Sequence, residues 1–110
     1  MRRFCLTLDL RPDPALIEEY IEHHKVVWPE VLASLHAAGV LDMQIYNTGN
    51  RLFMVMDTTD DFSLERKAAM DAANPKVLEW ETLMGRFQQV DVKANPTTRW
   101  VQMTKVFQLT

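Results

Sequence analysis

The sequence has 110 residues, of which 47% are hydrophobic and 25% are charged. This length and composition are typical of one globular domain covering residues 1–110, and they exclude a disordered or fibrous chain. The net charge is −3, with acidic and basic residues interspersed, so we expect no nucleic-acid partner. The single cysteine, Cys5, excludes a disulfide within the chain and favours a cytoplasmic location.

The N-terminal segment, residues 1–14, has a positive start in Arg2 and Arg3, but its apolar run is short and Asp9 interrupts it. This pattern predicts a strand rather than a signal peptide. No apolar run approaches the ~18 residues that a membrane span needs, so we expect no membrane partner.

Residues 3–10 alternate between apolar and other side chains, which predicts a first strand. From about Pro14 the apolar residues recur with helical spacing. This helix is expected to end or bend at Trp28, because a residue before proline disfavours helical backbone. Pro29 suits the first turn of a second helix, which we expect to continue to Gly39.

Two strands, residues 40–47 and 51–58, follow and are joined by a short hairpin whose glycine suits the positive φ of the turn. The second of them is apolar on both faces, which predicts an interior strand. Ser63 is a suitable N-cap for a third helix, and Pro75 starts a fourth that we expect to reach Gln89. Residues 99–109 alternate again and predict a closing strand.

The expected order is therefore β-α-β-β-α-β, with each helical segment split in two. This is the α+β, ferredoxin-like pattern of a four-stranded antiparallel sheet with helices on one face. The other face would stay bare in a monomer. The residues expected on it are mixed in character rather than fully polar: Thr7, Gln44, Tyr46, Gln102, Thr104 and Val106. A symmetric homodimer would cover this face.

Two adjacent histidines, His23 and His24, lie in the first predicted helix of a chain that has three histidines. On a helical wheel, His24 falls in the middle of the apolar stripe and His23 at its polar edge. An ionisable ring at a core-facing position is unusual, because burial disfavours its charge and requires hydrogen-bond partners. Tyr20 lies one turn earlier on the same face, within side-chain reach. This feature alone leaves open whether His24 has a chemical role or is a core residue.

Other kinds of site fit the sequence poorly. Adjacent histidines on a helix point about 100° apart and cannot share one metal ion, and nothing supplies the remaining ligands. Cys5 has no predicted base beside it, so we expect no nucleophilic triad. Trp80 is by default a packing residue, but an indole beside an imidazole and a phenol also suits the apolar side of a sugar ring. The residues therefore favour proton transfer on a small neutral molecule, without a metal or cofactor.

Four segments together resemble the L-rhamnose mutarotase family: EEYIEHHKVVWPEV (18–31), IYNTGNRLFMVM (45–56), NPKVLEWETLM (74–84) and MTKVFQL (103–109). The Tyr-x-x-x-His-x-x-x-Trp-Pro-Glu element is the most specific of them. The resemblance implies a dimeric ferredoxin-like α/β barrel. It implies an isomerase of sugar catabolism that interconverts the α and β anomers of a deoxy sugar without metal or cofactor. It also implies that His24 is the catalytic acid/base and that Tyr20 binds the sugar.

The sequence departs from the family pattern at two positions. Such mutarotases carry a second binding tyrosine three residues before the position of Tyr46, where this chain has Met43, and a Trp-Trp pair where it has Trp80 and Glu81. The resemblance implies substrate contacts at these four positions, with Glu81 accepting a hydrogen bond from a sugar hydroxyl. The Glu81 variant resembles the branch associated with L-fucose. L-fucose is therefore favoured over L-rhamnose as the monosaccharide substrate.

Two other functions remain open. Small ferredoxin-like dimers include haem-degrading and cofactor-free monooxygenases, in which a helix histidine can bind haem, and a Soret band on haem titration would support that function. A non-catalytic sugar-binding module would bind sugar without accelerating anomeric exchange.

Overall fold

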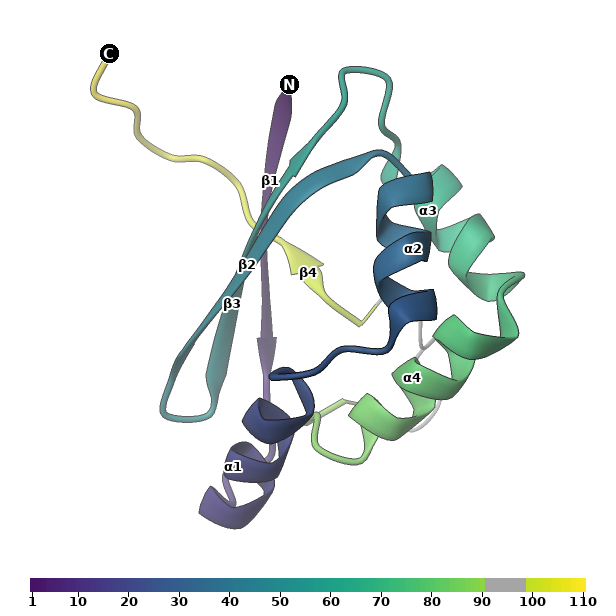
Figure 1. The fold of residues 1–110 in the computed structure, drawn as a ribbon. Helices are drawn as coiled ribbons and strands as arrows, with labels where there is room; N and C mark the ends of the chain where they lie inside the picture. Colours follow the sequence, from purple (N-terminus) through teal and green to yellow (C-terminus); the bar gives the residue numbers. More distant parts are fainter. Residues whose placement is uncertain (91–98) are drawn as a thin grey trace.

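The computed structural model describes residues 1–90 and 99–110. Its elements in chain order are β1 (Arg2–Asp9), α1 (Pro14–His23), α2 (Pro29–Ala37), β2 (Val40–Thr48), β3 (Arg51–Thr58), α3 (Leu64–Ala72), α4 (Pro75–Gly85) and β4 (Val101–Gln102). The strands form one antiparallel sheet in the order β2-β3-β1-β4, with the helices to one side of it (Figure 1). The predicted α+β, ferredoxin-like architecture with split helices is confirmed, as is the interior position of β3.

The helices begin where the sequence signals indicate. The side chains of Asp13, Ser63 and Asn74 accept hydrogen bonds from backbone N–H groups of α1, α3 and α4 at 3.0, 3.2 and 3.1 Å. Prolines occupy the first turn of α1, α2 and α4, where an N–H group has no intrahelical partner to lose. No helix within the described ranges is both long and apolar enough to cross a membrane.

Helix α1 ends at His23, before the end near Trp28 that the proline rule predicts. Trp28 has the extended backbone of a residue before proline, with φ −57° and ψ 135°. The chain leaves the helix earlier, where the N–H of His24 donates to the carbonyl of Ile21 at 3.1 Å in a tightened last turn. His24 therefore lies at the C-terminal end of α1, where the helix carbonyls lack N–H partners.

The segment after α4 does not continue the helix to Gln89 as predicted, but runs beside the end of β1. The N–H of Arg11 donates to the carbonyl of Phe87 at 2.9 Å, and the N–H of Gln89 donates to the carbonyl of Asp9 at 2.9 Å. These bonds hold the end of α4 next to the start of α1. Two helices far apart in the sequence can therefore supply side chains to one site.

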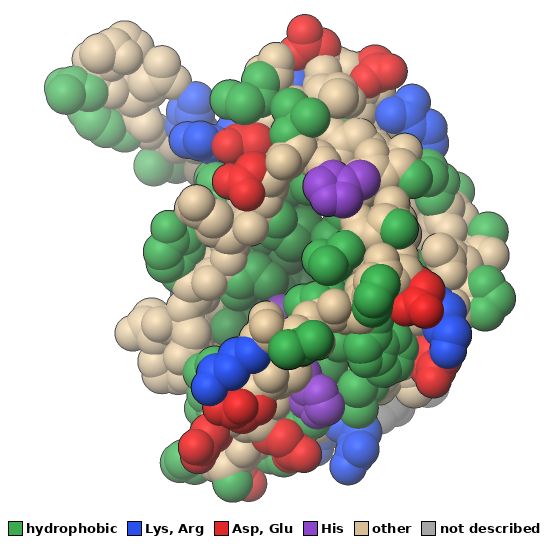
Figure 2. Space-filling model, viewed as in Figure 1, with side chains coloured by type: hydrophobic (Ala, Val, Ile, Leu, Met, Phe, Trp, Pro, Cys, Tyr) green, Lys and Arg blue, Asp and Glu red, His purple; other side chains and the backbone are tan. Residues whose placement is uncertain are grey.

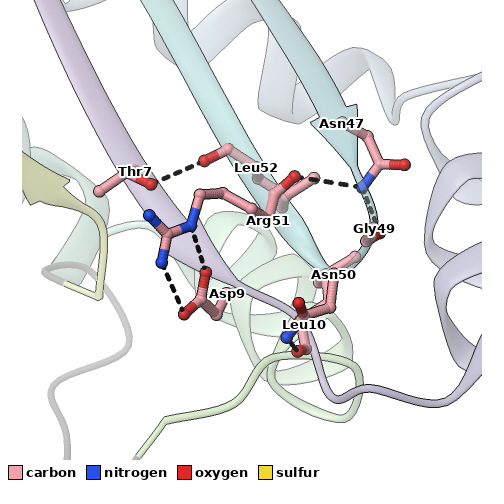
Figure 3. A network of polar contacts seen from close by, with 8 residues as sticks. All are labelled: Thr7, Asp9, Leu10, Asn47, Gly49, Asn50, Arg51 and Leu52. Atoms are coloured by element: carbon pink, nitrogen blue, oxygen red, sulfur yellow. Dashed lines mark hydrogen bonds and ion pairs between the residues drawn. The ribbon is translucent and has the colours of Figure 1, made fainter.

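A network of polar contacts ties the β2–β3 hairpin to the end of β1 (Figure 3). The side chain of Asn50 donates to the carbonyl of Leu10 at 2.9 Å, and Arg51 Nε pairs with the carboxylate of Asp9 at 3.1 Å. Gly49 makes the turn with a φ of 55°, the left-handed conformation that the sequence predicts for this hairpin. The network fixes the position from which the chain enters α1.

Among the described residues, most of the buried hydrophobic side chains form two clusters on the helix side of the sheet. One contains Phe4, Leu6, Ala38, Val40, Met54, Met56 and Phe62, and the other contains Leu10, Tyr20, Val31, Leu52, Trp80, Met84 and Phe87. The half-buried Ile45 and Trp100 pack against both clusters, so the two meet. That residues 1–110 form a single domain stays a prediction.

The closing strand is shorter than the predicted residues 99–109. Strand β4 consists of Val101 and Gln102, and the segment after it, residues 103–110, extends away from the body of the molecule (Figure 1). The N–H of Met103 still donates to β1, and beyond it the chain diverges from that strand. Alternation in the sequence makes a segment compatible with a sheet, but only a hydrogen-bonded neighbour makes it a strand.

The helix-free face of the sheet is only partly the one predicted. Thr7 lies on it, because it has the opposite parity to the buried residues of β1. Gln44 and Tyr46 also lie on it, because they have the opposite parity to the β2 residues that face the cavity, Met43 and Ile45. Gln102 does not: it pairs directly with Leu6 of β1, so both side chains point to the helices. The other two residues predicted from the closing strand lie in the extended segment after β4: Thr104 and Val106.

Candidate active site

A cavity of about 540 Å³ lies between the sheet and the helices. Figure 2 shows a hollow between them that is lined largely by hydrophobic side chains. The volume falls within the roughly 300–1,000 Å³ that is usual for small-molecule sites. The sequence-predicted site residues that line the cavity are Tyr20, His24, Met43, Trp80 and Glu81.

His24 is held by the end of its own helix. Its Nδ1 lies 2.9 Å from the backbone carbonyl of Tyr20. A carbonyl oxygen can only accept, so Nδ1 carries the hydrogen and, in the neutral ring, Nε2 carries the lone pair. Burial lowers the pKa of His24 below its usual value, and this effect outweighs the hydrogen bond to Tyr20, which raises it. The imidazole is therefore suited to accept a proton at Nε2 near neutral pH.

Aromatic rings enclose the His24 side chain on two sides. The ring of Tyr20 lies 4.4 Å from it between centroids, and the ring of Trp80 lies 5.4 Å away in an edge-on arrangement at 70°. Trp28 meets Trp80 in a similar T-shaped contact at 5.2 Å. These contacts fix the imidazole and give the cavity a wall of π-faces, the surface on which sugar C–H groups pack.

Tyr20 is buried, with 3% of its surface exposed. Burial raises the pKa of its phenol, as does the nearby charge of Glu81, while a hydrogen bond with Gln88 lowers it. The net effect is a pKa well above the ordinary value. Tyr20 is therefore a neutral hydroxyl that can hydrogen-bond a ligand but releases its proton with difficulty.

Glu81 is the second ionisable group of the cavity with a strongly shifted pKa. The pKa of its carboxyl is raised to about 7, chiefly by burial; Lys67 and Arg99 lower it, and Asp71 adds to the increase. Lys67 itself pairs with Asp71 at 2.6 Å, four residues along α3. Near pH 7 the Glu81 carboxyl is therefore present in both the protonated and the ionised form, so it can donate or accept a proton.

Several further polar or aromatic lining residues were not predicted from the sequence: Lys67, Asp71, Gln88, Trp100 and Gln102. Gln88 had a detectable signal, because it continues the inward stripe formed by Val77, Glu81 and Met84 at helical spacing. Lys67 and Asp71 had a weaker one, an opposite-charge pair four residues apart in a helix. Nothing in the local sequence indicates that these residues face α4.

Tyr46 is the one predicted site residue that the structure does not bring to the cavity. Met43 and Ile45 of β2 face the helices, so Tyr46 faces the other way, and it is 56% exposed. Its ring lies 6.4 Å from that of Phe53, and its hydroxyl donates to Gln44 at 2.9 Å. Within one chain, Tyr46 therefore cannot make the predicted contact with a sugar bound in this cavity.

The other two histidines lie apart from this arrangement. His23 packs against Phe87 with 5.5 Å between ring centroids, and His36 is exposed on α2. In the described part of the chain, no three His, Cys, Asp or Glu side chains are grouped so that they could hold a metal ion.

Known proteins share both the sequence and the fold. The family model described as L-rhamnose mutarotase matches residues 3–109. An L-fucose mutarotase of Xanthomonas campestris is 41% identical over 99% of this chain and 89% of its own length. An L-rhamnose mutarotase of a Jannaschia species is 30% identical over 99% of both chains. The crystal structure of an L-rhamnose mutarotase from Formosa agariphila superposes with a TM-score of 0.75 over the whole of both chains, at 22% identity, which supports the fold. A mutarotase is an isomerase that acts on a sugar, and this chain belongs to the L-rhamnose mutarotase family.

Proposed function

We propose that this protein interconverts the α and β anomers of a 6-deoxy-L-hexopyranose, with L-fucose preferred over L-rhamnose. The reaction opens the sugar ring to the aldehyde and closes it again on the other face of the carbonyl. Opening requires removal of a proton from the anomeric hydroxyl and delivery of a proton to the ring oxygen. Both transfers are within reach of groups that titrate near neutral pH.

The observation that carries the proposal is the His24 imidazole at the cavity wall. The Tyr20 carbonyl fixes its tautomer, burial favours its neutral form, and two aromatic rings hold its orientation. A neutral, oriented imidazole is what a general base requires. We assign to His24 the role of principal proton carrier.

The remaining roles follow from the chemistry of each side chain. The neutral Tyr20 hydroxyl would hydrogen-bond a sugar oxygen, and Trp80 would pack against the apolar face of the ring. Met43 would contribute thioether surface beside the sugar. Glu81 would meet at least one hydroxyl group, which is the contact expected from the sequence resemblance.

The preference for L-fucose is supported by the Xanthomonas relative, an L-fucose mutarotase that is 41% identical to this chain. It is also supported by the two departures from the rhamnose pattern, Met43 and Glu81, which both line the cavity. The two sugars differ in the configuration of ring hydroxyls. A hydroxyl left unmatched in a buried site costs about 1–3 kcal/mol, which is enough to discriminate between them.

We also infer that the protein is a homodimer joined through the helix-free face of the sheet. That face carries the exposed Tyr46 and Val101 beside the half-buried Phe53. The segment 103–110 adds exposed apolar side chains of its own, among them Phe107. Surfaces of this kind favour association with a second copy. The cytoplasmic location expected from the sequence stays a prediction.

Anomeric exchange measured by saturation-transfer NMR tests the proposed function. We expect the purified protein to accelerate exchange of L-fucose more than that of L-rhamnose, and of both more than that of D-glucose. If the exchange of L-rhamnose were accelerated more than that of L-fucose, only the proposed substrate preference would be wrong. Absence of acceleration with every hexose would overturn the function, and a haem titration that gives a Soret band would then favour the monooxygenase alternative.

A further inference from the structure

Glu81 is an acidic residue on the inward face of a helix. It lies four residues after Val77 and three before Met84, both of which are buried, so it continues their stripe along α4. It is also the direct neighbour of Trp80, whose ring touches the His24 imidazole. Glu81 and His24 line the same cavity from different helices. The carboxyl group of Glu81 and the imidazole of His24 therefore open on the same cavity.

The groups around Glu81 do not neutralise a carboxylate strongly. From α3, Lys67 and Asp71 both face it, but they form an ion pair with each other at 2.6 Å. Arg99 donates through Nη1 to the backbone carbonyl of Glu81 at 2.9 Å and to the Gln88 side chain at 3.2 Å, rather than through these bonds to the carboxylate. Tyr20 and His24 are neutral, and α2 contributes only apolar side chains to the cavity: Val31, Leu32 and Leu35.

This environment explains why the carboxyl retains its proton up to about pH 7. The loss of hydration on burial is the largest influence on its pKa, and the opposing influences of Lys67, Asp71 and Arg99 partly cancel. The cavity therefore holds two groups whose surroundings shift them in opposite senses. The pKa of His24 is lowered, which favours a base, and the pKa of Glu81 is raised, which favours an acid.

Ring opening needs both kinds of group at once. His24 can accept the proton of the anomeric hydroxyl at Nε2, but it cannot at the same moment give one to the ring oxygen. Tyr20 is a poor donor, because burial raises the pKa of its phenol far above neutral pH. Lys67 and Asp71 also line the cavity, but they are held to each other in an ion pair. Among the described cavity residues, Glu81 is therefore the one whose acid form is suited to the second transfer.

We propose that Glu81 is a catalytic residue, the proton donor to the ring oxygen in the step in which His24 removes the anomeric proton. As the C1–O5 bond breaks, the O1–H electrons form the C1=O1 double bond, His24 becomes imidazolium and Glu81 becomes carboxylate. After the aldehyde has rotated, the Glu81 carboxylate takes the proton from the O5 hydroxyl as O5 attacks C1. The His24 imidazolium returns its proton to O1, so both residues regain their starting states. This assignment rests on the proposed function and goes beyond hydroxyl binding by Glu81.

The pH dependence of kcat distinguishes proton donation from hydroxyl binding. A donor must be protonated, so the wild-type kcat for L-fucose is expected to fall as the pH rises above about 7. The base must be neutral, so kcat is also expected to fall on the acid side, below the ordinary histidine range. The two limbs together give a bell-shaped profile that can be measured on the wild-type protein without any substitution.

The variant test uses Glu81→Gln, which keeps the size and hydrogen-bonding capacity but cannot release a proton. Its kcat is expected to fall at least 10-fold, and the alkaline limb of the profile is expected to disappear. The matched control is Glu79→Gln on the outer face of the same helix, where Glu79 is exposed and pairs with Lys76. This control should retain both the rate and the bell shape.

The possible results distinguish proton donation by Glu81 from hydroxyl binding. A wild-type profile that stays flat from pH 7 to 9 would overturn the assignment, as would a Glu81→Gln variant with a raised KM and an unchanged kcat profile. The second result would mean that Glu81 only binds a hydroxyl. If the wild-type protein accelerates the exchange of no hexose, the proposed function itself is wrong. If the wild-type protein is active and Glu81→Gln is equally active, only the role of Glu81 is wrong.

Discussion

The two faces of the sheet differ in what they expose, although neighbouring residues of the same strands supply both. On β2, Met43 faces the helices and lines the cavity, whereas Tyr46 lies on the other face, open to solvent. On β1, the buried Leu6 and the half-buried Thr7 divide in the same way. The covered face meets helices that carry ionisable groups, whereas no helix of the described residues packs on the other face.

The sheet therefore contributes the apolar floor of the cavity, while its proton-transfer groups come from helices. His24 lies at the end of α1 and Glu81 on α4, and neither strand nor hairpin supplies an ionisable side chain to the cavity. On the helix-free face, hydroxyl, amide and aromatic groups lie side by side. We expect substitutions on the covered side to change catalysis and those on the helix-free face to change assembly.

The largest effect is expected at His24. His24→Asn should lower the acceleration of anomeric exchange by ~10²–10⁴-fold, as loss of a general base typically does, because asparagine cannot carry a proton in this pH range. His23→Asn is the matched control, since His23 packs against Phe87 outside the cavity and should leave the rate nearly unchanged. Circular dichroism checks that both variants fold. A folded His24→Asn protein with the full rate would remove His24 from the mechanism.

The next largest effect is expected at the centre of the helix-free face. Light scattering should give the wild-type protein twice the chain mass of 12.8 kDa at micromolar concentration. Phe53→Lys should weaken this association roughly 100-fold or more, because an unpaired charge buried in an interface costs several kcal/mol. The activity per chain should persist, since the cavity lies on the other side of the sheet.

Glu65→Lys, at an exposed position of α3, serves as the control for added positive charge. It should leave the mass measured by light scattering unchanged. A wild-type protein that is monomeric under these conditions would contradict the proposed dimer. A dimeric Phe53→Lys variant would move the interface away from the helix-free face.

A third prediction concerns the energetic cost of keeping Glu81 in the cavity. The folded-state pKa is about 7 and the unfolded value is 4.5, so between these pH values the folded protein holds a proton that the unfolded chain has lost. Stability contributed by this group therefore falls as the pH rises from 4.5 and is lowest above pH 7. Glu81→Gln should raise the free energy of unfolding at pH 8 by about 1–3 kcal/mol, a value reduced for solvent in the cavity, with little gain at pH 4.5.

Urea denaturation at both pH values measures this difference. Glu79→Gln, which removes an exposed carboxylate from the same helix, should show no such trend. Equal gains for Glu81→Gln at pH 4.5 and pH 8 would mean that burial does not hold the proton on Glu81. Reduced activity together with increased stability would identify Glu81 as a residue kept for function at a cost in stability.

The sequence predicted those features of the molecule that depend on local pattern. The strand and helix order, the Ser63 cap and the inward direction of His24 follow from spacing along the chain. Tyr46 lies on the helix-free face, as the strand pattern predicted, and its pairing with Phe53 of β3 agrees with this. The expected sugar contact of Tyr46 came from the family resemblance instead, and it does not fit the direction of this side chain within one chain.

Contacts between distant elements were beyond the local pattern. Lys67 and Asp71 reach the cavity because α3 packs beside α4, and Gln102 reaches it because it pairs with Leu6. The residue at which α1 ends depends on how the chain turns towards Trp28. The proline rule located this helix end only approximately. That turn frees the carbonyl of Tyr20 to fix the His24 tautomer, so a central feature of the site arises from a helix end that the sequence did not predict.

The smallest expected effect compares two positions on one strand. Met43→Tyr would put a phenol into the cavity at the position where rhamnose mutarotases carry a binding tyrosine, and the cavity has room for it. One additional hydrogen bond is worth about 0.5–1.5 kcal/mol, so the L-fucose to L-rhamnose ratio of kcat/KM should shift towards L-rhamnose by ~3–10-fold. Tyr46→Phe removes a hydroxyl three residues away on the opposite face, where it bonds to Gln44, and should leave the ratio unchanged. The same NMR exchange assay measures both variants with both sugars.

If Tyr46→Phe shifted the ratio as much as Met43→Tyr, the sugar would have to reach the helix-free face. The assignment of catalysis to the covered face and of assembly to the other face would then be wrong. If only Met43→Tyr shifts it, the parity of β2 is what separates a specificity residue from a surface residue.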